Sequence, residues 1–155
     1  MTTTVDELLS QVRYAERLCQ RTARLYRRLQ TASTFLSIVG GGGLLSAVAS
    51  ASPAWVPVTG AVLLAVVGAA NLAIRPADKA SQNEADVKRY SALRARSVGM
   101  TFVELSKALE EARMSDAPEF EPLRDVAWND VVAELGYPEM REPLSLQQRV
   151  LAALA

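Results

Sequence analysis

The longest apolar stretch of the chain runs from Leu29 to Ile74, and its forty-six residues include no Asp, Glu, Lys or Arg. A helix needs roughly 20 residues at about 1.5 Å each to cross the hydrocarbon core of a membrane. The segments 31–51 and 54–74 each reach that length. The pattern therefore predicts a transmembrane helical hairpin over 31–74.

Two other structures could contain such a stretch. A soluble protein can bury long apolar helices, but a chain of 155 residues leaves too little other mass to cover two of them. A cleaved signal peptide is the second alternative, because Ala47-Val48-Ala49 resembles a cleavage site. Against it, the preceding segment carries acids and a second membrane-length segment follows at once. We expect both spans to be retained.

Apolar positions at heptad spacing lie on both sides of the hairpin. The spacing predicts an amphipathic helix over 1–30 and a second long helix over 75–114. Both helices leave the membrane on the same side, so we expect their apolar stripes to pair with each other or with a second copy of the chain. The stripe residues are Val12, Cys19, Tyr26, Leu29, Val98, Phe102, Leu105 and Leu109.

The segment 115–155 is predicted to be a small helical C-terminal tail. A helix over Pro122–Leu135 should be closed by Gly136, since glycine commonly follows the last helical residue. Ser145 and Gln148 form a capping-box pattern before a final short helix. The fold class expected from the whole pattern is an all-α membrane protein: a two-transmembrane hairpin, long N- and C-terminal cytoplasmic helices, and this tail.

The formal charges cancel over the whole chain, yet they are unevenly placed. Twelve Lys and Arg accompany six Asp and Glu up to Arg96, whereas five accompany eleven from Ser97 onward. Basic residues near a span tend to remain cytoplasmic, so both termini should be cytoplasmic. Basic residues next to the spans are also expected to contact anionic lipid headgroups. These residues are Arg21, Arg24, Arg27, Arg28, Arg75 and Lys79. The acids of the tail favour solubility or could meet the basic collar of a neighbouring subunit.

Four consecutive glycines lie inside the first span. A phosphate-binding loop would need a preceding strand and, in its commonest form, a Gly-Lys-Ser/Thr ending, and neither is present in the sequence. Inside a bilayer, small residues allow helices to approach closely. The glycines therefore predict helix packing or a bend that serves as a hinge. The small residues expected at this interface are Gly40, Gly41, Gly42, Gly43, Ala47, Gly60, Ala61, Ala65, Gly68 and Ala69.

Few side chains of the sequence are suited to catalysis or to metal binding. Asn71 is the strongly polar side chain deep in the second span, and it is interpreted as an interhelical hydrogen-bonding group or as a pore-lining group. The chain has no His and a single Cys, Cys19, which we interpret as a small core residue. Without His there is no self-contained Ser-His-Asp triad. We expect no catalytic residue, no metal site, no cofactor, no enzyme activity and no nucleic-acid partner.

The order of these segments resembles the two-transmembrane SLATT domains, which are bacterial membrane effectors associated with nucleotide-based antiphage signalling. The resemblance spans roughly 15–113. It rests on RTARLYRRLQTAS before the first span, on WVPVTGAVLLAVVGAANLAI in the second, and on RPADKASQNEADVKRYSALRAR after it, which contains Tyr90-x-x-Leu93. The resemblance implies a pore-forming or membrane-disrupting effector of the bacterial inner membrane. The tail lies outside it and no nucleotide-sensing domain is recognisable, so a trigger would act in trans.

Three hypotheses for function follow. The first is an oligomeric inner-membrane effector whose hairpins assemble into a pore when a sensor or signalling protein acts on it. The second is a non-enzymatic membrane anchor or scaffold, including a phage-encoded holin-like protein. The third is an enzyme, for which the residue types offer little. Loss of membrane potential on expression would separate the first hypothesis from the second.

Overall fold

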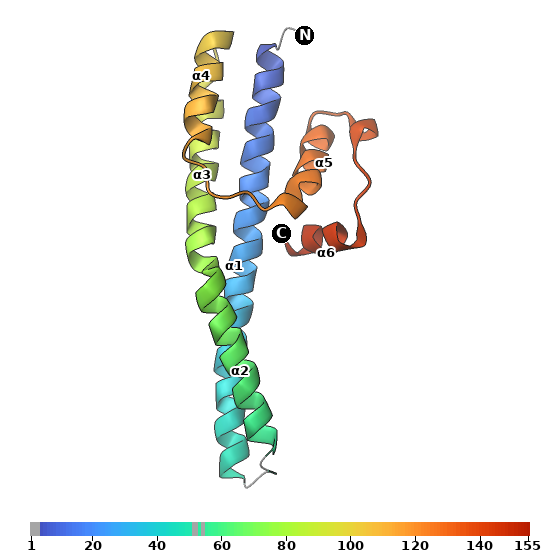
Figure 1. Ribbon diagram of the computed structural model, residues 1–155. Coiled ribbons are helices and arrows are strands. Elements are labelled where there is room, and N and C mark those ends of the chain that lie inside the picture. Colours follow the sequence, from blue (N-terminus) through green and yellow to red (C-terminus); the bar gives the residue numbers. More distant parts are fainter. Residues whose placement is uncertain (1–3, 51–52, 54) are drawn as a thin grey trace. The chain divides into compact units, whose positions relative to one another are not determined.

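The computed structural model describes residues 4–50, 53 and 55–155, and every regular element among them is helical (Figure 1). This confirms the predicted all-α class. The α-helices are α1 (Val5–Ala49), α2 (Trp55–Ile74), α3 (Pro76–Arg96), α4 (Phe102–Arg113), α5 (Arg124–Glu134) and α6 (Leu146–Leu154). Two short 3₁₀ turns are η1 (Glu121–Leu123) and η2 (Pro138–Met140).

The chain divides into two compact units. Residues Tyr26–Asp78 form one unit, which we call the apolar unit. Residues Met1–Leu25 and Lys79–Ala155 form the other, which we call the polar unit. Helix α1 is continuous across the boundary, because its sequence holds no proline and its glycines lie within an otherwise strong apolar helical run.

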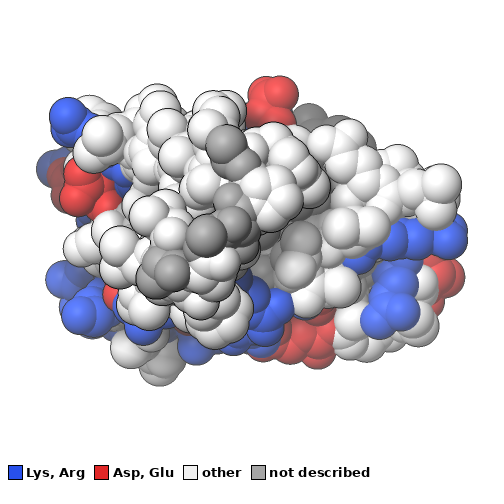
Figure 2. Space-filling model, turned by 90° about the horizontal axis from the view of Figure 1, so that it is seen from below, with Lys and Arg blue, Asp and Glu red and all other residues white. Residues whose placement is uncertain are grey.

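The apolar unit contains the C-terminal part of α1 and the whole of α2, which run side by side in opposite directions (Figure 1). The most apolar 18-residue windows of these helices have mean hydropathies of 1.4 and 2.0, and 0% of either window is buried. The core helix of a soluble protein would be mostly buried. Figure 2 looks onto the end of the pair, and the surface nearest the viewer carries no charged residue among those described. The chain thus has two helices long and apolar enough to cross a membrane.

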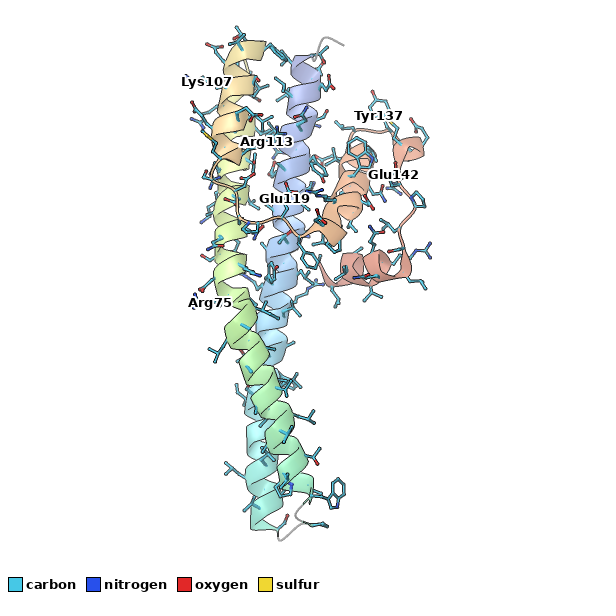
Figure 3. All side chains as sticks on the ribbon, viewed as in Figure 1. Arg75, Lys107, Arg113, Glu119, Tyr137 and Glu142 are labelled. Atoms are coloured by element: carbon cyan, nitrogen blue, oxygen red, sulfur yellow. The ribbon has the colours of Figure 1, made fainter. Side chains whose placement is uncertain are left out.

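In the polar unit, α3, α4 and the N-terminal part of α1 enclose a first apolar core. Its buried members come from all three helices: Leu8, Val12, Tyr90, Leu93, Leu105, Leu109 and Ala112. Arg113 of α4, which is labelled in Figure 3, also donates to the side-chain oxygen of Gln11 of α1 at 2.9 Å. The stripes predicted before and after the hairpin therefore meet within one chain.

The segment 75–114 forms two helices where the sequence analysis predicts one. Gly99 has a φ of +87°, a conformation that costs residues with a Cβ but not glycine. Thr101 then starts α4 with a complete capping box: its backbone N–H donates to Glu104 Oε2 at 2.8 Å and its hydroxyl accepts from the Glu104 N–H. The turn reverses the chain, so that Leu105 and Leu109 add to the core built by α1 and α3.

The tail is helical, as predicted. Helix α5 is followed by Gly136 with a φ of +84°, which matches the predicted glycine stop. Helix α6 begins with the predicted capping box, in which both arms between Ser145 and Gln148 are formed. A second apolar core joins the tail to α1 in the polar unit. Its buried members are Leu18, Leu25, Leu123, Val126, Ala127 and Ala155.

Candidate functional site

The contact between α1 and α2 in the apolar unit is built from two glycines and two leucines. A Cβ added at Gly40 would lie 2.8 Å from Leu64 Cδ2, and one added at Gly60 would lie 2.6 Å from Leu44 Cδ2. Each leucine therefore occupies the space that a glycine of the other helix leaves open. Gly40 and Leu44 are four residues apart, as are Gly60 and Leu64, so each pair lies on one helix face. A larger residue at either glycine must displace the opposing leucine.

The other glycines of the spans do not take part in this contact. A Cβ added at Gly41, Gly42, Gly43 or Gly68 would meet no described atom within 4 Å. Two of the six glycines, Gly40 and Gly60, thus form the contact within the hairpin, and a packing or hinge role for the other four stays a prediction. Of the predicted alanines, Ala61, Ala65 and Ala69 are exposed, and Ala47 is half-buried.

An apolar groove of about 610 Å³ lies between the two helices of the apolar unit. Gly41 contributes to it, so this glycine widens the groove without touching α2. The groove is lined by Gly41, Leu44, Leu45, Val48, Pro57, Val58 and Ala61.

Asn71 lies near the end of α2. Its side-chain Oδ1 is buried and accepts no hydrogen bond from any residue that the structure describes. The contacts of Gly40 with Leu64 and of Leu44 with Gly60 set a register that brings Ser33 level with Asn71. The Ser33 hydroxyl instead donates to the Gln30 carbonyl at 2.9 Å. The interhelical hydrogen bond considered from the sequence is thus not formed at this oxygen, and the pore-lining role stays a prediction.

The basic residues next to the spans have different surroundings. Arg24, Arg27, Arg28 and Arg75 are exposed, and Lys79 is half-buried. Arg21 differs from these residues because its guanidinium is paired within the chain. Its guanidinium Nε and Nη2 donate to the two carboxylate oxygens of Asp130 at 2.8 and 3.0 Å, and its Nη1 donates to the Ala152 carbonyl at 3.1 Å.

The residues of the predicted pairing stripes divide into two groups. Five of them are buried or pack against the first apolar core: Val12, Cys19, Tyr26, Leu105 and Leu109. The other three are exposed, namely Leu29 at 45%, Val98 at 89% and Phe102 at 39%. These three side chains are therefore not buried within one chain, and their pairing with a second copy stays a prediction. Val98 lies in the turn between α3 and α4, where helical spacing does not apply.

Cys19 packs against the first core, as predicted for a small core residue. Burial raises the pKa of its thiol to about 12, and the neighbouring carboxylates Asp86 and Asp116 raise it further in the same direction. The thiolate is the reactive form of cysteine, so the raised pKa lowers the reactivity of this side chain at neutral pH.

Two ion pairs that were not predicted from the sequence join α1 to α5 in the polar unit. Arg17 Nη2 lies 2.7 Å from Glu134 Oε2, and Arg21 Nε lies 2.8 Å from Asp130 Oδ2. Both arginines and both acids are four residues apart, so the two pairs form a short antiparallel ladder. That spacing is the feature of the sequence that could have indicated the two ion pairs. The tail acids therefore meet basic residues of their own chain.

A second polar cluster fixes the linker between α4 and α5. Asp86, which is 2% exposed, accepts from Arg89 Nη2 at 2.7 Å and from the backbone N–H of Ala117 at 2.9 Å. Asp116 accepts from the Tyr90 hydroxyl and from Arg89 Nη1. Desolvation raises the pKa of Asp116, and the nearby Asp86 adds to that effect. These residues were not predicted, because they come together only when α4 folds back.

Within the described ranges, no group of three or more His, Cys, Asp or Glu side chains is placed to hold a metal ion. Comparisons of the chain with protein-family models, with curated proteins and with solved structures give no match. The site must therefore be interpreted from its own contacts.

Proposed function

We propose that the chain is a two-span protein of the bacterial inner membrane with both termini in the cytoplasm. The observation that carries this proposal is the exposure of the two apolar windows, of which 0% is buried. An apolar surface of that extent is stable in hydrocarbon and costly in water. The basic residues that flank the pair, such as Arg28 and Arg75, support the orientation.

Cysteine labelling in intact cells tests this topology. In a Cys19→Ala background, Ser50→Cys should react with a membrane-impermeant thiol reagent, and Ser81→Cys should react only after the cells are opened. Ser50 and Ser81 are both exposed in the structure. Native Cys19 is unsuitable as the internal control, because its partial burial and raised pKa would slow its labelling on either side of the membrane. Equal labelling at both positions in intact cells would overturn the topology.

Within that membrane, the protein acts as an oligomeric effector that raises permeability when a partner triggers it. Gly41, Gly42 and Gly43 support this role, since they leave part of α1 open to close approach by another helix. The resemblance to SLATT domains, stated from the sequence, supports it as well. The proposal includes neither catalysis nor a cofactor.

Membrane potential after induced expression is the deciding measurement. A potential-sensitive dye should report depolarisation by the wild type and much less by a Gly42→Leu variant that reaches the membrane at the same level. A wild type that leaves the potential unchanged, with and without candidate partners from neighbouring genes, would contradict the effector role.

A passive anchor or scaffold is the second candidate, and the polar unit favours it. That unit has two apolar cores and a tail held to α1 by two ion pairs, so it is a folded body of its own. An anchor would leave the membrane potential intact at any expression level, whereas an effector would not.

A further inference from the structure

A cavity of about 270 Å³ lies between α1 and α5 in the polar unit. This volume lies just below the range typical of sites for drug-sized ligands, so the cavity suits a small ligand and not a large organic one. Its lining is mainly polar and comes from seven residues: Arg17, Gln20, Arg21, Arg24, Asp130, Ala133 and Glu134. Three guanidinium groups against two carboxylates leave an excess of one positive charge.

Two of the guanidinium groups are held in fixed orientations. Arg21 uses three of its five N–H groups, two on Asp130 and one on the Ala152 carbonyl. Arg17 likewise uses three, two on Glu134 Oε2 and one on Gln20 Oε1 at 3.0 Å. Each retains two donors. The carboxylates therefore orient the arginines without using up their hydrogen-bonding capacity.

Arg24 completes the lining and differs from the other two arginines. It is exposed, and it forms no hydrogen bond or ion pair with the residues that the structure describes. Its position, three residues after Arg21, places it on the same face of α1. All five of its donors are free to bind a ligand.

We propose that this cavity binds a phosphate group, either free or carried by a lipid headgroup. Guanidinium groups match the geometry of phosphate oxygens and bind them in a bidentate manner. A phosphate monoester carries about −1.5 to −2 charges near neutral pH and three acceptor oxygens, so it competes with Asp130 and Glu134 better than a single carboxylate would. Arg24 supplies the main contact, and Arg21 and Arg17 add their remaining donors.

The test uses the full chain in detergent micelles, with arginine labelled at Nε and followed by NMR. Titration with inorganic phosphate should shift the Arg24 and Arg21 resonances to saturation. Arg24→Ala should weaken phosphate binding by at least about tenfold, since it removes the charged donor with no competing partner. The phosphate affinity of Arg24→Lys should lie between those of the wild type and Arg24→Ala, because lysine keeps the charge and loses the bidentate geometry.

Arg96→Ala is the matched control. Arg96 is an exposed arginine of the same unit and donates only within its own helix, to the Ala92 carbonyl. Phosphate affinity should be unchanged in this variant. Equal affinities for Arg24→Ala and Arg96→Ala would overturn the site.

Lipid nanodiscs separate the two sources of phosphate. If lipid is the source, phosphatidic acid in nanodiscs should shift the Arg24 resonance at a lower ligand concentration than inorganic phosphate does. If free phosphate is the source, inorganic phosphate should saturate the site and these nanodiscs should leave the Arg24 resonance unchanged. Failure of both probes overturns the proposal. Because these measurements do not use membrane potential, their result is independent of the effector role.

Discussion

The apolar unit and the polar unit hold their helices together by opposite means. In the polar unit, Leu93 and Leu105 are 2% and 0% exposed, and arginine–carboxylate pairs lie at the edges of the cores. In the apolar unit, Leu45 and Leu72 are 75% and 80% exposed, and the helices meet at glycines. Leucine side chains are thus buried in the polar unit and exposed in the apolar unit.

The proposed membrane location of the apolar unit accounts for this difference. Water drives leucines out of contact with it, so the polar unit gains stability by burying them. Hydrocarbon gives no such drive, and helices in a bilayer associate by close packing, for which glycine is suited. Apolarity alone does not tell where a side chain lies. The length of the charge-free stretch supports the proposed membrane location, because it matches two membrane crossings.

The largest effect is expected from a charge placed in the polar unit's core. Leu105→Asp should lower the free energy of unfolding of that unit by about 3–5 kcal/mol, because the carboxylate would be buried without a partner. Hydrogen exchange in detergent should rise in α3 and α4 and stay unchanged in α2. Val103→Asp is the control on the same helix, since Val103 is 73% exposed, and it should change stability little.

A simultaneous rise of exchange in α2 would contradict the independence of the two units. The apolar unit and the polar unit would then unfold together as one cooperative structure.

A smaller effect is expected when a glycine of the apolar unit is enlarged. Gly40→Leu should destabilise the contact between α1 and α2 by about 1–3 kcal/mol, because the new side chain must displace Leu64. Hydrogen exchange of α2 amides in micelles measures this. Gly42→Leu is the matched control, since no described atom lies within 4 Å of a Cβ there. Similar exchange in both variants would show that the Gly40 contact does not stabilise the pair.

The sequence predicted those parts of the fold that depend on local patterns. The two apolar helices followed from missing charges, and the start of α6 followed from Ser145 and Gln148. The turn at Gly99 was missed because apolar residues on both sides of it keep helical spacing. Nor could periodicity tell Gly40 from Gly41, since which face meets α2 depends on the register of two helices.

The candidate sites were predicted less well than the fold. Arg21 was identified as a basic residue near a span, yet its partner Asp130 lies 109 positions further along the chain. No local pattern specifies such a contact. The i, i+4 spacing of Arg17 with Arg21 and of Asp130 with Glu134 is compatible with a ladder but does not require one.

Acidification should weaken the α1–α5 ladder of the polar unit and leave the apolar unit unaffected. The hydrogen bond from Arg17 lowers the pKa of Glu134 from its ordinary value of 4.5. A carboxyl with a lowered pKa contributes stability above its unfolded pKa, and this is lost as the pH falls through the folded value. Glu134→Gln should cost about 0.5 kcal/mol at pH 7, because both side chains are more than a third exposed.

Thermal unfolding at a series of pH values measures this loss. The difference between wild type and Glu134→Gln should disappear below the folded pKa of Glu134. Glu139→Gln, at another exposed glutamate of the tail, should show no such difference. A gap between wild type and Glu134→Gln that persists at low pH would assign the effect to packing.

An effect of similarly small size concerns Arg75, where the chain leaves α2 and enters α3. Arg75 has a φ of +48°, which is unfavourable for a residue with a Cβ by about 1–2 kcal/mol, and its N–H donates to the Asn71 carbonyl at 3.0 Å. Arg75→Gly removes that strain, but glycine also gives the unfolded chain more freedom, which offsets about 0.4–1 kcal/mol. The net result should be stabilisation by about 0.5 kcal/mol, seen as a slightly higher unfolding temperature in micelles. Arg75→Ala separates charge from backbone, because it removes the guanidinium and keeps the strained conformation. If the unfolding temperature rises as much in the alanine variant as in the glycine variant, the charge of Arg75 and not its backbone conformation limits stability at this junction.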